Sequence, residues 1–134
     1  MLEPRWVSRA MIEAAHYDQI QKTGGTQGIL DENELESLIA RPKNYLAYGQ
    51  AVDIFDLAAC YVWGFACTQV FADGNKRAGL SALLMFLGLN GYRLTCDREP
   101  LVLMVRSVAN KKMSQDDVAI WLRENVEQWG NNEP

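Results

Sequence analysis

The sequence predicts an all-α fold, a single compact domain over residues 1–134 with about six helices and one small β-hairpin. Three observations support this prediction. Side chains suited to cap helices precede several apolar runs. No repeat, linker or shift in composition divides the 134 residues, a length typical of one domain. Apolar residues recur at helical spacing, most clearly at Leu80, Leu83, Leu84 and Leu87.

The N-terminal part predicts a helix followed by a short glycine-rich segment. Ser8 is placed to cap a helix that runs to about Lys22, and Gly24-Gly25 would stop that helix by allowing a left-handed exit. Residues 24–30 are too few and too rich in glycine for another helix. We therefore expect a turn or a small β-hairpin there.

The next two helices are predicted from their first residues. Asp31 with Glu34 resembles a capping box and starts a helix that Pro42 ends, because proline lacks the N–H donor. Asp53 then opens a strongly apolar run that continues to about Thr68. Since apolar groups cover most of its circumference, we expect this segment to be the central buried helix.

The C-terminal half continues mainly in helices. The leucine-rich helix follows a break in the chain and ends at Asn90-Gly91. We expect a short extended segment over residues 92–96 and a further helix over residues 98–111. Ser114 starts the last helix, and Trp129 is placed on its apolar side.

Composition and charge exclude several function classes. The net charge of −4 and the pI of about 5.0 disfavour direct binding to nucleic acid. No apolar run has the length of a membrane span, and the first residues do not resemble a signal peptide. Cys60, Cys67 and Cys96 lack CxxC spacing and lie far from His16, which disfavours zinc. We expect a cytoplasmic protein without membrane attachment.

The loop before the leucine-rich helix carries the sharpest chemical signal. Gly74 permits a tight turn that leaves the backbone N–H groups of Asn75, Lys76 and Arg77 free at a helix N-terminus, where phosphate binds well. Lys76 and Arg77 add positive charge, and Asp73 is an oxygen ligand suited to Mg²⁺. From the spacing alone, a capped helix start with a solvated charged turn is an equally good interpretation.

Several segments resemble the Fic/Doc superfamily. Residues 69–77, Q-V-F-A-D-G-N-K-R, resemble the core motif of its Doc branch, the death-on-curing toxins, which reads His-x-Phe-x-Asp/Asn-Ala/Gly-Asn-Lys-Arg. Residues 24–28, 31–37 and 40–42 are similar to the target-binding flap of the family and the helix that follows it. The resemblance covers most of residues 5–125.

The resemblance implies the toxin of a toxin–antitoxin system that acts as an ATP-dependent protein kinase. In that scheme Asp73 holds Mg²⁺, and Gly74, Asn75, Lys76 and Arg77 bind the phosphates of ATP. Lys76 stands where the AMP-transferring Fic branch has a second glycine. The similarity to the Doc branch therefore implies transfer of the γ-phosphate, not adenylylation.

Gln69 departs from the motif in a chemically important way. It occupies the position of the histidine that, in the family, takes the proton from the target hydroxyl as general base. Glutamine can form hydrogen bonds but cannot accept that proton near neutral pH. We therefore expect this chain to be inactive. His16 is no obvious substitute, because its place between apolar residues of the first helix indicates a structural, hydrogen-bonded histidine.

The resemblance also implies two protein partners. Gly25, Thr26, Gln27 and Gly28 would form the flap that aligns an extended target segment, and the family suggests a translation GTPase, elongation factor Tu, as that target. An antitoxin would place a helical inhibitory segment with an acidic residue across the cleft of residues 69–77.

Two alternatives stay open at this point. The chain could be a natural pseudoenzyme that keeps nucleotide or partner binding without turnover. It could also be an adenylylating Fic protein, although Lys76 and Leu80 disfavour this. The sequence leaves open whether the glutamine at position 69 is natural or engineered.

Overall fold

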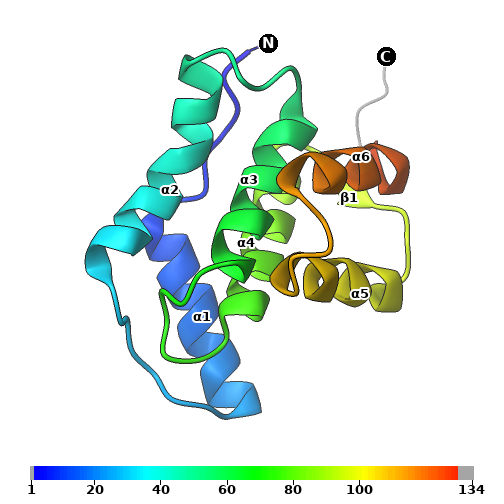
Figure 1. The fold of residues 1–134 in the computed structure, drawn as a ribbon. Helices are drawn as coiled ribbons and strands as arrows, with labels where there is room; N and C mark the ends of the chain where they lie inside the picture. Colours follow the sequence, from blue (N-terminus) through cyan, green and yellow to red (C-terminus); the bar gives the residue numbers. More distant parts are fainter. Residues whose placement is uncertain (1, 130–134) are drawn as a thin grey trace.

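Helix α3 (Ile54–Ala66) runs through the middle of the structure, a computed structural model that describes residues 2–129. Figure 1 shows α1 and α2 on one side of it and α5 and α6 on the other. From Leu57 to Ala66, every residue of α3 except Trp63 is buried, which confirms the central helix. The remaining elements are α1 (Arg9–Thr23), α2 (Glu32–Ala47), α4 (Asn75–Leu89), β1 (Tyr92–Leu94), α5 (Arg98–Ala109), α6 (Gln115–Asn125) and β2 (Val126–Gln128). The all-α fold with six helices is confirmed for the described residues.

The predicted helix starts are confirmed by hydrogen bonds at the caps. The side chains of Ser8, Asp31 and Asp53 each accept backbone N–H groups from the first turn of α1, α2 and α3. Ser114 and Asp117 form a complete capping box at the start of α6. These caps satisfy N–H groups that have no partner within the helix, so they fix where each helix begins.

The prediction that Pro42 ends the second helix is wrong. Helix α2 continues through Pro42 to Ala47. Pro42 is buried on the same face as Leu35 and Leu38, where α2 packs against α3. Burial of this apolar face offsets the hydrogen bond that the proline ring removes, because most helix stability in proteins comes from packing.

The small sheet lies elsewhere than predicted. Residues 24–30 form no hairpin; the two strands that the structure describes, β1 and β2, pair antiparallel with Tyr92 opposite Gln128. Because the chain enters β2 after Asn125, the last helix ends there, and Trp129 lies beyond it and not on its apolar side. The third helix likewise ends at Ala66, slightly before the predicted end near Thr68.

Close packing of α4 against α3 places the loop that joins them. A Cβ atom added to Gly79 would lie 3.0 Å from the carbonyl oxygen of Val62, so no larger residue fits without a shift of the backbone. The glycine thus lets the two helices approach closely. Helix α1 also packs on α4. The loop that joins α3 to α4 therefore lies near the end of α1 as well as the start of α4.

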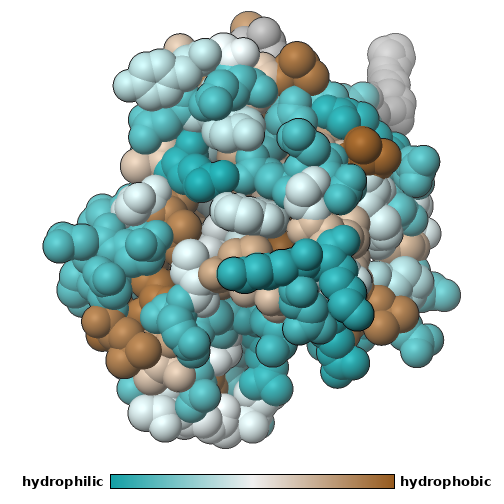
Figure 2. All heavy atoms as spheres, in the orientation of Figure 1, coloured by the Kyte–Doolittle hydropathy of each residue, from teal (hydrophilic) through white to brown (hydrophobic). Residues whose placement is uncertain are grey.

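The surface offers little continuous apolar area in the orientation of Figure 1. Figure 2 shows mainly hydrophilic side chains on this face, with the hydrophobic ones in small separate patches. Among residues 2–129, no helix combines the length and the apolar composition needed to cross a membrane.

Candidate active site

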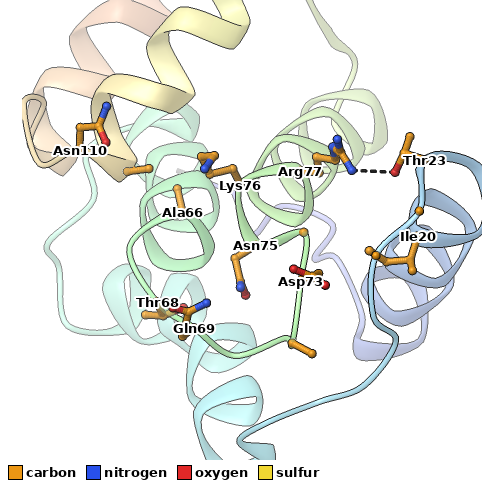
Figure 3. Close-up of a pocket in the computed structure, with 15 residues that line it drawn as sticks. Ile20, Thr23, Ala66, Thr68, Gln69, Asp73, Asn75, Lys76, Arg77 and Asn110 are labelled. Carbon is orange, nitrogen blue, oxygen red and sulfur yellow. Dashed lines mark hydrogen bonds between the residues drawn. The ribbon is translucent and has the colours of Figure 1, made fainter.

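A cavity of about 570 Å³ opens at the junction of α1, α4, α5 and the loop between α3 and α4. We call it the loop cavity. Figure 3 shows its lining side chains around the start of α4, with Thr23 and Asn110 on opposite sides. Of the predicted site residues, it brings together Gln69, Asp73, Gly74, Asn75, Lys76, Arg77 and Gly25.

Gly74 shapes the entrance to α4. Its φ of 79° and ψ of 25° are left-handed, and no side chain caps the helix at this end. A Cβ atom here would lie 3.2 Å from Cδ1 of Ile20 and 3.5 Å from Nε2 of His16, so a larger residue would be both strained and crowded. The N-terminus of α4 therefore faces the cavity with its backbone donors uncovered by any cap, which favours an anion.

Asn75 closes the loop on itself. Its side-chain oxygen accepts the N–H of Phe71 at 2.9 Å, and its side-chain nitrogen donates to the carbonyl of Phe71 at 3.0 Å. The amide predicted to help bind nucleotide is thus engaged within the loop. What Asn75 can offer a phosphate is its backbone N–H.

His16 holds the loop from beneath. Its Nε2 donates to the carbonyl oxygen of Asp73 at 2.7 Å, and its ring stacks on Phe71 with the centroids 3.8 Å apart. Both side chains are buried, at 6% and 1% exposure. The prediction of a structural, hydrogen-bonded histidine is confirmed, and Phe71 is buried beside it in the core. Since Nε2 of His16 is committed to this bond, it is not free to replace a base at position 69.

The charged side chains of the loop cavity have only neutral partners. One carboxylate oxygen of Asp73 accepts the backbone N–H of Thr26 at 2.7 Å. Nη1 of Arg77 donates to the hydroxyl of Thr23 at 2.6 Å, as Figure 3 shows. Within residues 2–129, neither Lys76 nor Arg77 forms an ion pair. The positive charge of these two exposed residues is therefore available to a ligand.

Gln69 lies on the wall of the same cavity and is exposed. It follows Thr68, whose hydroxyl donates to the carbonyl of Gly64 at 2.9 Å and so continues the end of α3. Gln69 thus lines the same space into which the start of α4 opens.

The predicted flap pairs with the active-site loop. Leu30 donates its N–H to the carbonyl of Val70 at 2.8 Å, and Ala72 donates to the carbonyl of Gly28 at 3.0 Å. With Thr26 bonded to Asp73, the segment is fixed along one of its edges. Gly25, Thr26, Gln27 and Gly28 are all exposed, which leaves their other side open to solvent.

Sequence reasoning missed several lining residues, among them Thr23 and Asn110. Thr23 is the last residue of α1 and meets Arg77 from 54 positions away; its only signal is its place just before the glycine pair. Asn110 caps the C-terminus of α5 and reaches the cavity because α5 packs against α3 and α4. Nothing in the local sequence indicates that role.

The donor set fits Mg²⁺ that arrives with a polyphosphate. Asp73 supplies one exposed carboxylate at the edge of the cavity. Among the described residues no group of three or more His, Cys, Asp or Glu side chains could hold a metal by itself. Mg²⁺ commonly binds through one or two carboxylates together with substrate phosphates. A single Asp73 beside a helix start with free backbone donors suits that arrangement.

Comparison with known proteins gives two matches. The sequence model of the Fic/DOC family matches residues 6–87, more than half of the chain. A protein of Escherichia phage P1 named "Protein kinase doc" is 32% identical over 119 residues, which cover 89% of this chain and 94% of that protein. Both matches span the loop cavity from the end of α1 through α4.

Proposed function

Because the chain belongs to the Fic/DOC family, we propose that it is the toxin of a toxin–antitoxin pair, built as an ATP-dependent protein kinase. One observation carries the proposal. The uncapped start of α4 opens onto a cavity in which Lys76 and Arg77 have no acidic partner among residues 2–129. Phosphoryl transfer needs this combination of backbone donors and positive charge around the transferred group.

In this proposal, the residues of the loop cavity have different roles. Backbone N–H groups at the start of α4 and the side chains of Lys76 and Arg77 bind the phosphates and neutralise their charge. Asp73 would hold Mg²⁺, which supplies further neutralisation of the phosphates when bound. His16 and Asn75 act on the loop and not on the nucleotide, since both hold its backbone in place.

The proposed reaction transfers the γ-phosphoryl group of ATP to a hydroxyl of a protein. The bond between the γ-phosphorus and the bridging oxygen breaks, a bond from the hydroxyl oxygen forms, and ADP leaves. The hydroxyl proton must go to a base beside the attacking oxygen. Gln69 holds the corresponding place on the cavity wall but has no basic group, so this chain binds ATP with little turnover.

The flap would present the target. Residues 25–28 are exposed and begin at the cavity with Gly25, and an extended target segment could pair with their free backbone edge. We propose that the target is a translation GTPase, elongation factor Tu. Because that factor works in the cytoplasm, we propose the same location for this protein. The antitoxin would cover the cleft of residues 69–77 with a helix that carries an acidic residue toward Arg77.

The test restores the missing base. Substitution Gln69→His should raise transfer of label from γ-labelled ATP to the translation factor by about 10²–10⁴-fold and make expression of the protein inhibit growth. The matched control is Gln69→His combined with Arg77→Ala, which should abolish the gain. Label from α-labelled ATP on the target would instead support adenylylation. A folded, ATP-binding Gln69→His variant without transfer would support the pseudoenzyme.

A further inference from the structure

A second, smaller cavity adjoins the loop cavity on the far side of Lys76 and Arg77. These two residues line both cavities, so the second lies next to the end of the first that is proposed to bind phosphate. It has a volume of about 280 Å³ and lies between α4 and α5. We call it the α4–α5 groove. Its lining includes Leu80 from the next turn of α4 but not Gln69 or any other residue of the loop.

The groove has an apolar floor and a cationic rim. Leu80, Val102 and Val105 form the floor, and Val105 is 4% exposed whereas the other two are half-buried. Arg98 and Arg106 form the rim, and both are exposed. Neither arginine has an ion-pair partner in the part of the chain that the structure describes.

We propose that the α4–α5 groove binds the nucleoside of the nucleotide, while the loop cavity binds its terminal phosphates. This inference rests on the proposed function. A base and its ribose offer flat apolar surface for the valine and leucine side chains, and guanidinium groups stack well on aromatic rings. The volume is near the lower bound of roughly 300 Å³ for small-molecule pockets, which suits one nucleoside and not a helix.

The direction of phosphoryl transfer supports the same assignment. The attacking and leaving oxygens lie roughly in line on opposite sides of the transferred phosphorus. The acceptor hydroxyl approaches beside Gln69, so the departing ADP extends away from Gln69. The α4–α5 groove borders Lys76 and Arg77 and does not touch Gln69. The nucleoside of ADP therefore falls over Leu80 and α5.

The test compares ATP with inorganic tripolyphosphate, which has the phosphates but no nucleoside. Calorimetry on the full chain with Mg²⁺ should give ATP an affinity about tenfold higher than that of tripolyphosphate. Val102→Trp, which fills the groove without changing its charge, should remove most of that difference and leave tripolyphosphate binding within about twofold. Leu103→Trp is the matched control, because Leu103 is 53% exposed on the same helix and lies outside the groove lining. It should leave both affinities unchanged.

A second readout keeps the test decisive if Val102→Trp unfolds. Photolabelling with 8-azido-ATP should modify the peptide that contains Arg98 and Arg106, and Arg98→Gln should reduce the labelling several-fold. Equal binding of ATP and tripolyphosphate to the parent protein, or photolabel confined to the flap, would overturn the nucleoside site while the proposed function stands. Failure of both ligands to bind would overturn the proposed function and the inference together.

Discussion

The N-termini of α3 and α4 are built in opposite ways. Helix α3 begins at Asp53, whose carboxylate accepts the N–H groups of Phe55 and Asp56 at 3.0 and 3.1 Å. Helix α4 begins at Gly74, which has no side chain to cap it. The first end has its backbone donors satisfied by the protein. The second leaves its backbone donors available to a ligand.

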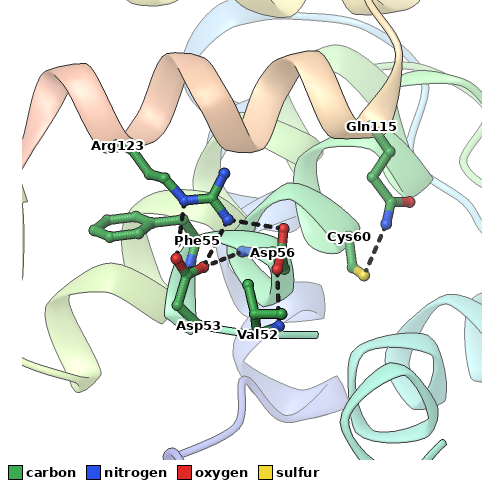
Figure 4. A network of polar contacts seen from close by, with 7 residues as sticks. All are labelled: Val52, Asp53, Phe55, Asp56, Cys60, Gln115 and Arg123. Carbon is green, nitrogen blue, oxygen red and sulfur yellow. Dashed lines mark hydrogen bonds and ion pairs between the residues drawn. The ribbon is translucent and has the colours of Figure 1, made fainter. Parts of the chain in front are cut away.

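The arginines beside these two ends differ in the same way. Arg123 donates to both Asp53 and Asp56 at distances from 2.8 to 3.1 Å, and Figure 4 shows these contacts. Burial alone would raise the pKa of Asp53, but the hydrogen bonds from Arg123 and from the start of α3 hold it below its ordinary value. Arg77 donates instead to the neutral hydroxyl of Thr23.

The comparison separates structural charge from functional charge. Around Asp53 each charge meets an opposite one, so the group can stabilise the packing of α6 on α3 without any ligand. Around Gly74 the cations lack such partners in the described residues, and this arrangement gains stability only when an anion binds. Arginine and aspartate thus have a structural role at one site and a ligand-binding role at the other, and the partners of each side chain distinguish the two roles.

The largest effect should follow removal of Arg77. Arg77→Ala should weaken ATP binding by about 10- to 100-fold, the range expected for lost hydrogen bonds to a charged ligand. The free energy of unfolding should change by no more than about 0.5 kcal/mol, because Arg77 is exposed. Calorimetry and urea denaturation measure the two quantities. The reciprocal control is Arg123→Ala, which should lower stability and leave ATP affinity intact. A loss of ATP affinity in Arg123→Ala would contradict the distinction between the structural charges around Asp53 and the ligand-binding charges around Gly74.

The next effect should come from Asp53. Asp53→Ala removes the cap of α3 and both hydrogen bonds that Arg123 makes with that carboxylate. The cap contributes about 0.5–2 kcal/mol, and a partly exposed ion pair adds at most about 1 kcal/mol. We expect the free energy of unfolding, measured with urea, to fall by about 0.5–3 kcal/mol and ATP binding to stay at the parent level. Unchanged stability would show that the capped end is not the stabilising one.

Local signals in the sequence predicted much of the fold. Caps act over three residues, so Ser8, Asp31, Asp53 and Ser114 could be recognised from their neighbours alone. The end of α2 could not, because Pro42 is tolerated through packing against a helix that comes later in the chain.

Contacts between segments far apart in the chain could not be predicted from the sequence. The pairing of β1 with β2 joins segments more than thirty residues apart, and the flap pairs with the loop near Phe71 instead of with itself. Residue types predicted His16 as buried and hydrogen-bonded, but its partner, Asp73, is 57 positions away. The motif predicted which residues carry charge at the site. It could not predict Thr23, which orients Arg77 from another helix.

The smallest effect should be a pH dependence of the free energy of unfolding that arises from Asp53, the cap of α3. Because the pKa of Asp53 in the folded protein lies below the ordinary value of 3.8, its ionised form favours folding. That contribution is fully present above pH 3.8 and is lost as the pH falls through the lower, folded value. Asp53→Asn can still cap α3 but carries no charge. The parent protein should therefore exceed Asp53→Asn in unfolding free energy by a constant amount between pH 7 and 5, and the difference should shrink below about pH 4.

Solvent limits the size of this difference. The side chains of Asp53 and Arg123 are 35% and 36% exposed, so water screens their attraction and we expect at most about 1 kcal/mol. Urea denaturation of both proteins at several pH values measures it, and added salt should reduce it further because the pair is partly exposed. A difference that stayed constant well below pH 3 would mean that the charge of Asp53 contributes nothing. In that case the two helix ends would differ in capping alone, and not in how their charges are paired.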